Sequence, residues 1–184
     1  GRGDQEAAVN LRPMQNAFER KYVAPHAGRV LIVGSKVYKT TEDRRVYHDD
    51  VLGVDMQDGP GVDRAVDFEE TVPDDLGTFG HVECCSVLEH SRRPWLMAQN
   101  IEHVMNVGAT LFLAVPFVWR VHAFPNDYWR FTLDGVQALF PRIRWETLVY
   151  GDVSLHNDRH VPLAQMDGHP YLARSEVLGF GVRT

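Results

Sequence analysis

The chain has 184 residues, of which 44% are hydrophobic and 24% are charged, and its formal net charge is -6. This length supports one well-buried core and is short for two, so we predict one domain over residues 1–184. A negative net charge excludes an overall positive potential that would attract nucleic acid, although it is compatible with a local basic patch. We expect no nucleic-acid partner.

Cysteine usage and hydropathy bear on the cellular location. No apolar stretch approaches the roughly 20 residues of a membrane helix, and the N-terminus lacks an apolar signal core. Cys84 and Cys85 are adjacent, so in a strand they point to opposite faces and build no disulfide framework. We expect a soluble protein of the reducing cytoplasm with no membrane partner. The sequence predicts no particular oligomeric state.

The first third of the chain combines an amphipathic helix with two apolar strands. Apolar residues spaced by three and four predict a helix over about residues 10–22, carrying Leu11, Met14, Phe18 and Tyr22. The runs 29–34 (RVLIVG) and 50–56 (DVLGVDM) lack alternation, as in parallel strands that are covered on both faces. Only about 15 residues separate them, so the crossover helix must be short or irregular.

Two shorter strands and a helix follow. We predict strands over residues 64–68 (RAVDF) and 80–87 (GHVECCSV), separated by a turn-rich segment. A helix then opens near Pro94, which suits a first turn, and Gly108 is placed to end it. One face of this helix carries Trp95, Ala98, Ile101 and Met105.

The last third begins with a buried strand over residues 110–117 (TLFLAVPF). A helix is predicted from Thr132 to about Pro141, and residues 143–150 and 176–182 are strand candidates. Strands that alternate with helices predict right-handed crossovers and a parallel sheet with helices on both faces. The expected fold class is therefore α/β, with a core over about residues 29–140 and C-terminal strands over about 143–184.

Acidic, small and apolar residues occupy the ends of the first four predicted strands. They are, in chain order, Gly34 and Ser35, Asp55 and Met56, Asp67 and Phe68, and Cys85 and Ser86. Ligands of open parallel sheets bind at the carboxyl ends of the strands, so these residues are expected to line one site. A solvated carboxylate is the commoner explanation for either acid alone, and the ordered set is the stronger signal.

Six segments carry a wider pattern between about residues 29 and 139: VLIVG, GVDMQDGPGVD, VDFEE, VECCSVLEH followed by RRPW, GATLFLAVPF and HAFPNDYWRFT. Their order resembles the class I S-adenosylmethionine-dependent methyltransferases, and VLEH with RPW and DYWRFT resemble small bacterial members most specifically. The resemblance implies a Rossmann-like three-layer sandwich whose mostly parallel sheet is closed by an antiparallel C-terminal strand.

The resemblance also implies S-adenosylmethionine as the cofactor and a role for each residue at the strand ends. The implied contacts are Gly34 and Ser35 beside the methionine part, Asp55 at the ribose, Met56 on the adenine face, Asp67 and the Phe68 backbone at the adenine amino group, and Cys85 and Ser86 under the methyl donor. Such a nucleoside site needs an apolar slot, a carboxylate for the diol and bare backbone near the charged tail.

The first glycine motif departs from the family pattern. Ile32 stands where an acid is usual, and Lys36 and Tyr38 replace two glycines. A side chain forced into a left-handed conformation costs roughly 1–2 kcal/mol, which a relaxed loop can absorb. Lys36 either repels the positive groups of the cofactor or pairs with its carboxylate, and we count it among the cofactor-binding candidates.

The segments after the fourth and fifth strands supply the candidates for catalysis. Methyl transfer to a hydroxyl or amine needs a base, and histidine suits this role near neutral pH. The candidates are His90, His122, Asp127 and Tyr128, with Arg130 beside them. The alternatives are that Glu89 and His90 cap the next helix and that the aromatic residues of 128–131 are core packing.

The histidines of the last third form no regular metal motif. His156, Asp158, His160 and His169 offer ligand atoms, but their mixed spacing is more typical of a polar loop, so we predict no metal site.

The sequence thus predicts a methyltransferase whose partner is a small-molecule or glycan acceptor with a hydroxyl or amine. The alternative is a non-catalytic methyltransferase-like module for binding or assembly, favoured by Ile32, Lys36 and Tyr38. A dinucleotide-dependent oxidoreductase fits less well, because a pyrophosphate needs glycines that this loop lacks.

Overall fold

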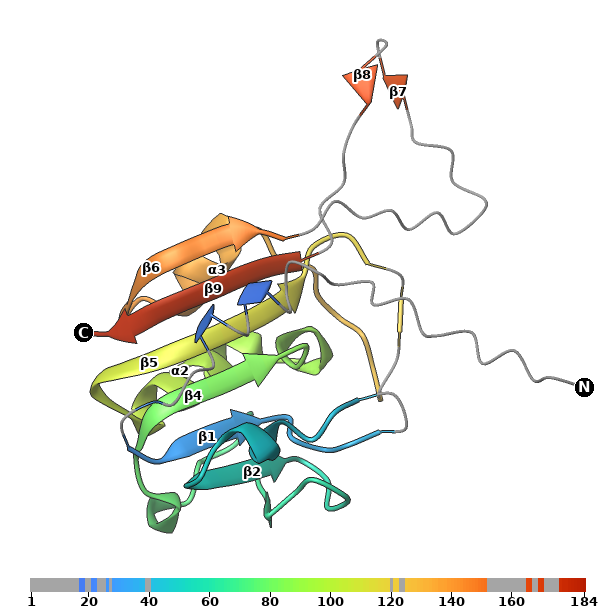
Figure 1. Ribbon diagram of the computed structural model, residues 1–184. Helices are drawn as coiled ribbons and strands as arrows, with labels where there is room; N and C mark the ends of the chain where they lie inside the picture. The colour runs from blue at the N-terminus through green and yellow to red at the C-terminus, as the bar shows by residue number, and fades with distance from the viewer. Residues whose placement is uncertain are drawn as a thin grey trace, which may run out of the picture.

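A computed structural model describes residues 17–18, 21–22, 26, 28–38, 41–119, 121–122, 125–151, 165–166, 169–170 and 176–184. Seven of the strands form one sheet in the order β3-β2-β1-β4-β5-β9-β6 (Figure 1). They are β1 (Val30–Val33), β2 (Val51–Asp55), β3 (Arg64–Ala65), β4 (Phe79–Cys85), β5 (Met105–Pro116), β6 (Ile143–Tyr150) and β9 (Glu176–Arg183). The short strands β7 (Gln165–Met166) and β8 (His169–Pro170) pair separately.

The strand directions confirm the predicted sheet. The strands from β3 to β5 pair in parallel, and β9 is antiparallel to both of its neighbours, β5 and β6. The C-terminal strand therefore lies between two strands instead of closing the edge. The carboxyl ends of β1, β2, β3 and β4 meet along one edge of the sheet, where the predicted site residues stand.

Helices and short turns cover the sheet. The helices α2 (Pro94–Val104) and α3 (Leu133–Leu139) lie on one face (Figure 1). On the other face Phe18 contacts Phe112 and Tyr22 stacks on Phe180, with 4.4 Å between the latter ring centroids. Residues 17–18 and 21–22 are helical, and the rest of the predicted N-terminal helix lies outside the described residues.

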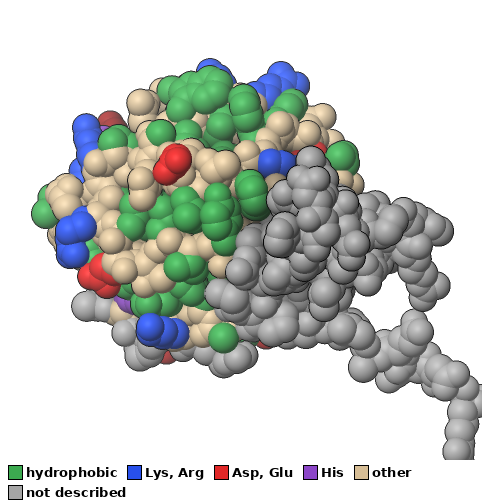
Figure 2. Space-filling model, turned by 90° about the horizontal axis from the view of Figure 1, so that it is seen from above, with side chains coloured by type: hydrophobic (Ala, Val, Ile, Leu, Met, Phe, Trp, Pro, Cys, Tyr) green, Lys and Arg blue, Asp and Glu red, His purple; other side chains and the backbone are tan. Residues whose placement is uncertain are grey.

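Three 3-10 turns lie between these elements: η1 (Arg44–Tyr47), η2 (Asp74–Leu76) and η3 (Leu88–His90). The predicted short crossover between the first two strands is confirmed, since η1 is its only helical segment in the part that is described. Among the described residues no helix combines the length and apolarity needed to cross a bilayer. On the face shown in Figure 2, basic side chains are scattered and do not gather in one patch.

The structure corrects the prediction for α2. The helix ends at Val104 and the chain continues directly into β5, so Gly108 lies inside a strand and does not end the helix. Trp95 was expected on the buried face, yet it is 47% exposed. Successive helix residues are about 100° apart, so Trp95 turns toward solvent when Pro94 and Ala98 face the sheet.

Two strand boundaries also differ from the prediction. β3 covers only residues 64–65, because the chain leaves the sheet edge before Asp67. β5 begins at Met105 instead of residue 110, and Met105 pairs with Phe79 ahead of a register shift, after which His81 pairs with Thr110. In contrast, residues 143–150 form a strand as predicted.

A buried charge network that the sequence did not predict lies on the sheet face opposite α2. Glu83 of β4 is fully buried and accepts hydrogen bonds from Arg44 Nε at 2.6 Å and His48 Nε2 at 2.8 Å. His81 Nε2 lies 3.7 Å from the same carboxylate, and its ring is stacked on His26 with 3.6 Å between centroids. The network ties η1 to the centre of the sheet.

His81 should make folding sensitive to mild acid. Burial lowers the pKa of His81 to about 4. Between its unfolded pKa of about 6.5 and this value, the unfolded chain takes up a proton that the folded chain does not, so the free energy of unfolding falls as pH falls. At about 1.4 kcal/mol per pKa unit, the loss from pH 7 to pH 4 is roughly 3 kcal/mol. Urea unfolding at pH 7, 5.5 and 4 measures it.

The matched variant is His81→Asn, whose amide can retain the contact that His81 Nδ1 makes with Thr110 Oγ1 at 2.7 Å. Its stability should depend less steeply on pH over this range. An equal slope in the two proteins would assign the acid sensitivity to another group, such as His26, whose pKa burial also lowers.

Candidate functional site

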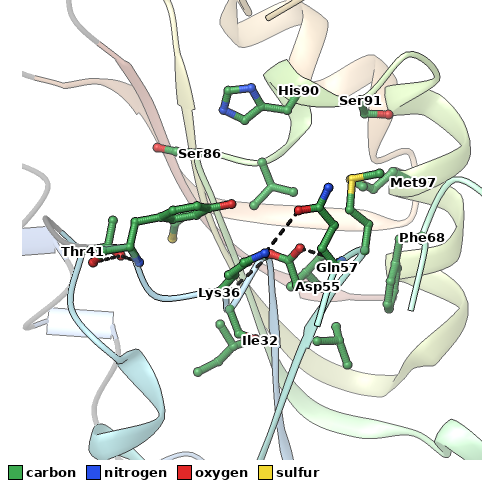
Figure 3. Close-up of a pocket in the computed structure, with 18 of the residues that line it drawn as sticks. Ile32, Lys36, Thr41, Asp55, Gln57, Phe68, Ser86, His90, Ser91 and Met97 are labelled. Atoms are coloured by element: carbon green, nitrogen blue, oxygen red, sulfur yellow. Dashed lines mark hydrogen bonds between the residues drawn. The ribbon is translucent and has the colours of Figure 1, made fainter. Parts of the chain in front are cut away.

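A cavity of about 600 Å³ opens at the carboxyl ends of the central parallel strands (Figure 3). Every residue proposed for cofactor binding lines it: Gly34, Ser35, Lys36, Asp55, Met56, Asp67, Phe68, Cys85 and Ser86. His90 and His122 also line it, whereas Asp127 and Tyr128 do not. The topology therefore brings side chains from five separate segments of the chain to one cavity.

The turn after β1 keeps a glycine where the geometry requires one. Gly34 has a φ of +74°, and a Cβ there would lie 2.3 Å from Val87 Cγ2. The backbone N–H groups of Gly34 and Ser35 both donate to Val54 O, at 2.8 and 2.9 Å. Only a residue without a side chain can make this turn against Val87.

The two substituted glycine positions carry no such strain. Among the described non-glycine residues, only Ser86 has a positive φ, so Lys36 and Tyr38 adopt conformations that side chains allow. Lys36 Nζ donates to Gln57 Oε1 at 3.2 Å, beyond the end of β2 (Figure 3). The loop has therefore taken a path without left-handed residues at these two positions, and its cation is directed toward Gln57.

One carboxylate, Asp55, stands at the end of β2, and a second, Asp67, follows two residues after the end of β3. Asp55 Oδ1 accepts from the Gln57 backbone N–H at 3.1 Å, and its Oδ2 lies 3.4 Å from the Lys36 backbone nitrogen. Asp67 Oδ1 accepts from the Glu69 backbone N–H at 2.8 Å. Each carboxylate oxygen can accept about two hydrogen bonds, so these backbone contacts orient both groups and leave capacity for a ligand.

The cavity floor combines apolar surface with one strained residue. Ile32 and Phe68 are buried and line the cavity, which provides apolar walls. Ser86 has a φ of +57°, a left-handed conformation that costs roughly 1–2 kcal/mol outside glycine. Its backbone N–H donates to Ala114 O at 2.8 Å, which holds this conformation at the end of β4. Such strain concentrates at functional sites.

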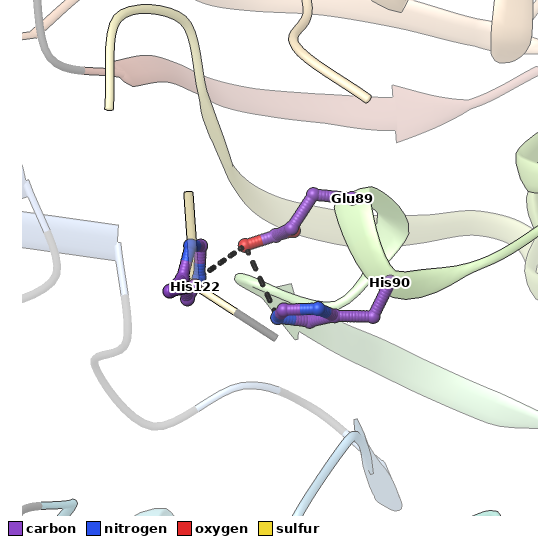
Figure 4. Close-up of side chains that lie close together, drawn as sticks. All are labelled: Glu89, His90 and His122. Atoms are coloured by element: carbon purple, nitrogen blue, oxygen red, sulfur yellow. Dashed lines mark ion pairs between the residues drawn. The ribbon is translucent and has the colours of Figure 1, made fainter. Parts of the chain in front are cut away.

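The segment after β4 places a buried carboxylate between two histidines (Figure 4). Glu89 is 1% exposed, and its Oε1 lies 3.8 Å from both His90 Nε2 and His122 Nε2. The helix-capping alternative is wrong, because Arg93 is the N-cap of α2 and makes no side-chain capping bond. The Glu89 carboxylate was not among the predicted site residues, although the VLEH segment contains it.

Asp127 lies behind His122 and orients it. Asp127 Oδ2 accepts from the His122 backbone N–H at 2.7 Å and lies 3.3 Å from His122 Nδ1. Arg130 donates to both oxygens of Asp127, at 2.6 and 2.8 Å. This guanidinium holds the pKa of Asp127 well below its usual range, so the group facing His122 is a carboxylate.

Tyr128 lies at the surface, away from the cavity. Its hydroxyl accepts from Arg92 Nε at 3.0 Å, and the residue is 42% exposed. Trp129 is also exposed and Phe131 is buried, so the core-packing alternative holds for Phe131 alone. The histidine-rich segment with His156, Asp158 and His160 lies outside the described residues, and so does the side chain of His169.

No protein-family model matches the chain, and neither does any curated protein sequence. Solved structures do match. The 1,6-didemethyltoxoflavin-N1-methyltransferase of Burkholderia thailandensis is 14% identical, with a TM-score of 0.62 over 95% of this chain and 78% of that one. The N-methyltransferase NodS of Bradyrhizobium japonicum is 10% identical, with a TM-score of 0.60 over 99% and 93%. Both structures contain S-adenosylhomocysteine. The chain has the class I methyltransferase fold.

A third match with this methyltransferase fold comes from a complex between the Haloferax volcanii Trm112 methyltransferase activator and a methyltransferase. It is 14% identical, with a TM-score of 0.62 over 92% of this chain and 88% of that one. Identities this low establish the shared fold and leave the chemistry to be argued from the cavity itself.

Proposed function

We propose that the protein is an S-adenosylmethionine-dependent methyltransferase that acts on a hydroxyl or amine of a small molecule or glycan. One observation carries the proposal: all nine residues proposed for cofactor binding line a single cavity at the carboxyl ends of the strands of a methyltransferase fold.

The residues present fit the cofactor. A volume of about 600 Å³ falls within the usual range of ligand sites. Asp55 can accept hydrogen bonds from a ribose diol, and Asp67 can accept from an adenine amino group. Phe68 and Ile32 supply apolar wall, and the Lys36 ammonium is directed toward Gln57. The altered glycine motif therefore changes the loop without removing the features that a nucleoside needs.

The opposite side of the cavity is suited to deprotonation. When bound, S-adenosylmethionine supplies a methyl group that an oxygen or nitrogen attacks, while the carbon–sulfur bond breaks and leaves its electron pair on sulfur. The attacking group loses a proton in this reaction, and we propose that His90 and His122 assist that loss. Both line the cavity, and Figure 3 shows His90 and Ser86 across from Asp55. Asp127 fixes the orientation of His122.

A cytoplasmic location is part of the same proposal. It is supported by cysteine usage, since the adjacent Cys84 and Cys85 offer no disulfide framework of the kind found in secreted proteins.

Isothermal titration calorimetry with S-adenosylhomocysteine and S-adenosylmethionine tests the proposal. We expect micromolar affinity, or about -8 kcal/mol, because the carboxylates and the apolar wall are in place. No heat and no thermal shift at millimolar ligand would overturn the enzyme proposal and favour the non-catalytic binding module.

A further inference from the structure

We propose that Glu89, His90 and His122 form a binding site for one divalent transition-metal ion on the acceptor side of the cavity. Each residue offers one ligand atom, and the three atoms lie within 4.8 Å of one another. An ion could therefore lie within about 2.8 Å of all three ligand atoms. The usual metal–ligand bond length is shorter, at about 2.0–2.2 Å. Small side-chain rotations close that gap.

Both imidazoles are oriented as metal ligands usually are. His90 Nδ1 lies 2.5 Å from Asn126 O, and a backbone carbonyl can only accept, so Nδ1 carries the hydrogen. His122 Nδ1 lies 3.3 Å from the Asp127 carboxylate, which can accept its hydrogen, and His122 Nε2 lies on the side of Glu89. Both histidines therefore direct Nε2 toward Glu89. A metal-bound histidine almost always donates its other ring N–H to a carboxylate or carbonyl in this way.

Glu89 places a buried negative charge at this point, within the field of the Arg130 guanidinium, and its carboxylate can also hold a metal ion. Its side chain is 1% exposed, and Oε1 lies 3.8 Å from each Nε2. An imidazole lone pair directed at a carboxylate is stabilised when a proton or a metal ion lies between them. A metal ion satisfies both pairs at once, whereas protons require two imidazolium rings whose centroids are only 4.9 Å apart.

The surrounding backbone holds the three ligands in place. The Tyr128 backbone N–H donates to Glu89 O at 2.7 Å, and Trp129 Nε1 donates to Ser91 O at 2.8 Å. These bonds fix the segment after β4 to the segment that follows His122. A site supported by such contacts is preorganised, which lowers the cost of closing it around an ion.

The ligand set indicates the kind of metal and its use. Two imidazoles and one carboxylate suit Zn²⁺, Fe²⁺ or Mn²⁺, and three protein ligands leave coordination positions open. Resting on the proposed function, we infer that the acceptor is a hydroxyl compound. Its oxygen would occupy an open position, and coordination would lower the pKa of that hydroxyl so that its proton is released to water before attack on the methyl carbon. His90 and His122 would then assist deprotonation as ligands of the ion and would not accept the proton themselves.

Equilibrium dialysis of the full chain against Zn²⁺ and, separately, Mn²⁺, followed by elemental analysis, tests the site. We expect one ion per chain in the unchanged protein. In His122→Ala and in Glu89→Gln we expect the dissociation constant for the ion to be at least 100-fold larger. His103→Ala is the matched control, since this exposed histidine on α2 lies outside the cluster and should leave binding unchanged. Because Glu89 is buried, the fold of each variant is checked by circular dichroism and thermal unfolding.

Two results would overturn the site. One is the absence of stoichiometric binding at 100 µM metal. The other is binding that survives in folded His122→Ala but is lost in His156→Ala/His160→Ala, which would place the ion on histidines elsewhere.

Titration with S-adenosylhomocysteine in the same samples keeps the two proposals separate. Cofactor binding without metal would remove only the metal site, and metal binding without cofactor would remove only the proposed methyltransferase function.

Discussion

Replacing Asp55 with alanine is expected to weaken binding of S-adenosylhomocysteine at least about 100-fold, or about 2.7 kcal/mol. The carboxylate stands at the end of β2, is oriented by the Gln57 backbone N–H and lines the cavity. A hydrogen bond to a charged group contributes roughly 1.5–3 kcal/mol, and a ribose diol would make two of them. Isothermal titration calorimetry on Asp55→Ala and the unchanged protein measures the difference.

Two further variants separate ligand contact from damage to the loop. Asp58→Ala removes an exposed carboxylate three residues away that does not line the cavity, and it should bind as the unchanged protein does. Asp55→Asn keeps one acceptor oxygen and should lose less affinity than Asp55→Ala. The thermal midpoint of Asp55→Ala should shift by only a few degrees, because the side chain is partly exposed. Unaltered affinity in folded Asp55→Ala would refute the ribose contact.

The cofactor side of the cavity could be predicted because it depends on local order along the chain. Apolar runs predict parallel strands, and topology places their carboxyl ends together, so Asp55 and Asp67 meet without any knowledge of side-chain packing. The same logic predicted β6, β9 and the Thr132 cap of α3, whose side chain accepts from the Gly135 backbone N–H at 3.1 Å. These are features that sequence spacing alone determines.

Other features depend on tertiary contacts and could not be predicted in this way. Gly108 was expected to end α2, yet the chain enters β5 three residues earlier because pairing with Phe79 extends that strand. The position of the Glu89 carboxylate depends on His122, which is distant in sequence and meets it only in the folded chain. Likewise, the residues next to Glu83 in the sequence did not predict its contacts with Arg44 and His48.

Glu83→Gln is expected to destabilise the protein by about 3–5 kcal/mol, a large part of the 5–15 kcal/mol that usually separates folded from unfolded domains. The Arg44 guanidinium, 19% exposed, donates to Glu83 at 2.6 Å, and His48 donates at 2.8 Å. A neutral amide removes the negative charge that Glu83 places against this largely buried cation, and removing one charge of such a pair is the costly way to break it. Urea unfolding at pH 7 measures the loss.

The free energy of unfolding should also depend on pH differently in this variant at acidic pH. Burial alone would raise the pKa of Glu83, but the hydrogen bond from His48, the nearby His81 ring and the charge of Arg44 lower it below its usual value. A carboxylate with a depressed folded pKa contributes stability above its unfolded pKa of about 4.3, and this contribution is lost as pH falls below that value. Glu83→Gln should therefore show a smaller further loss below about pH 4 than the unchanged protein.

Two controls decide whether the effect comes from the buried pair. Glu146→Gln breaks the surface pair of Arg144 and Glu146 at 3.7 Å, and it should cost less than about 1 kcal/mol because both side chains are hydrated. The double variant Arg44→Met/Glu83→Met removes both charges and should recover part of the stability lost in Glu83→Gln. If Glu83→Gln unfolds at the same urea concentration as Glu146→Gln, the network does not stabilise the fold, and the attachment of η1 to the sheet must depend on apolar contacts instead.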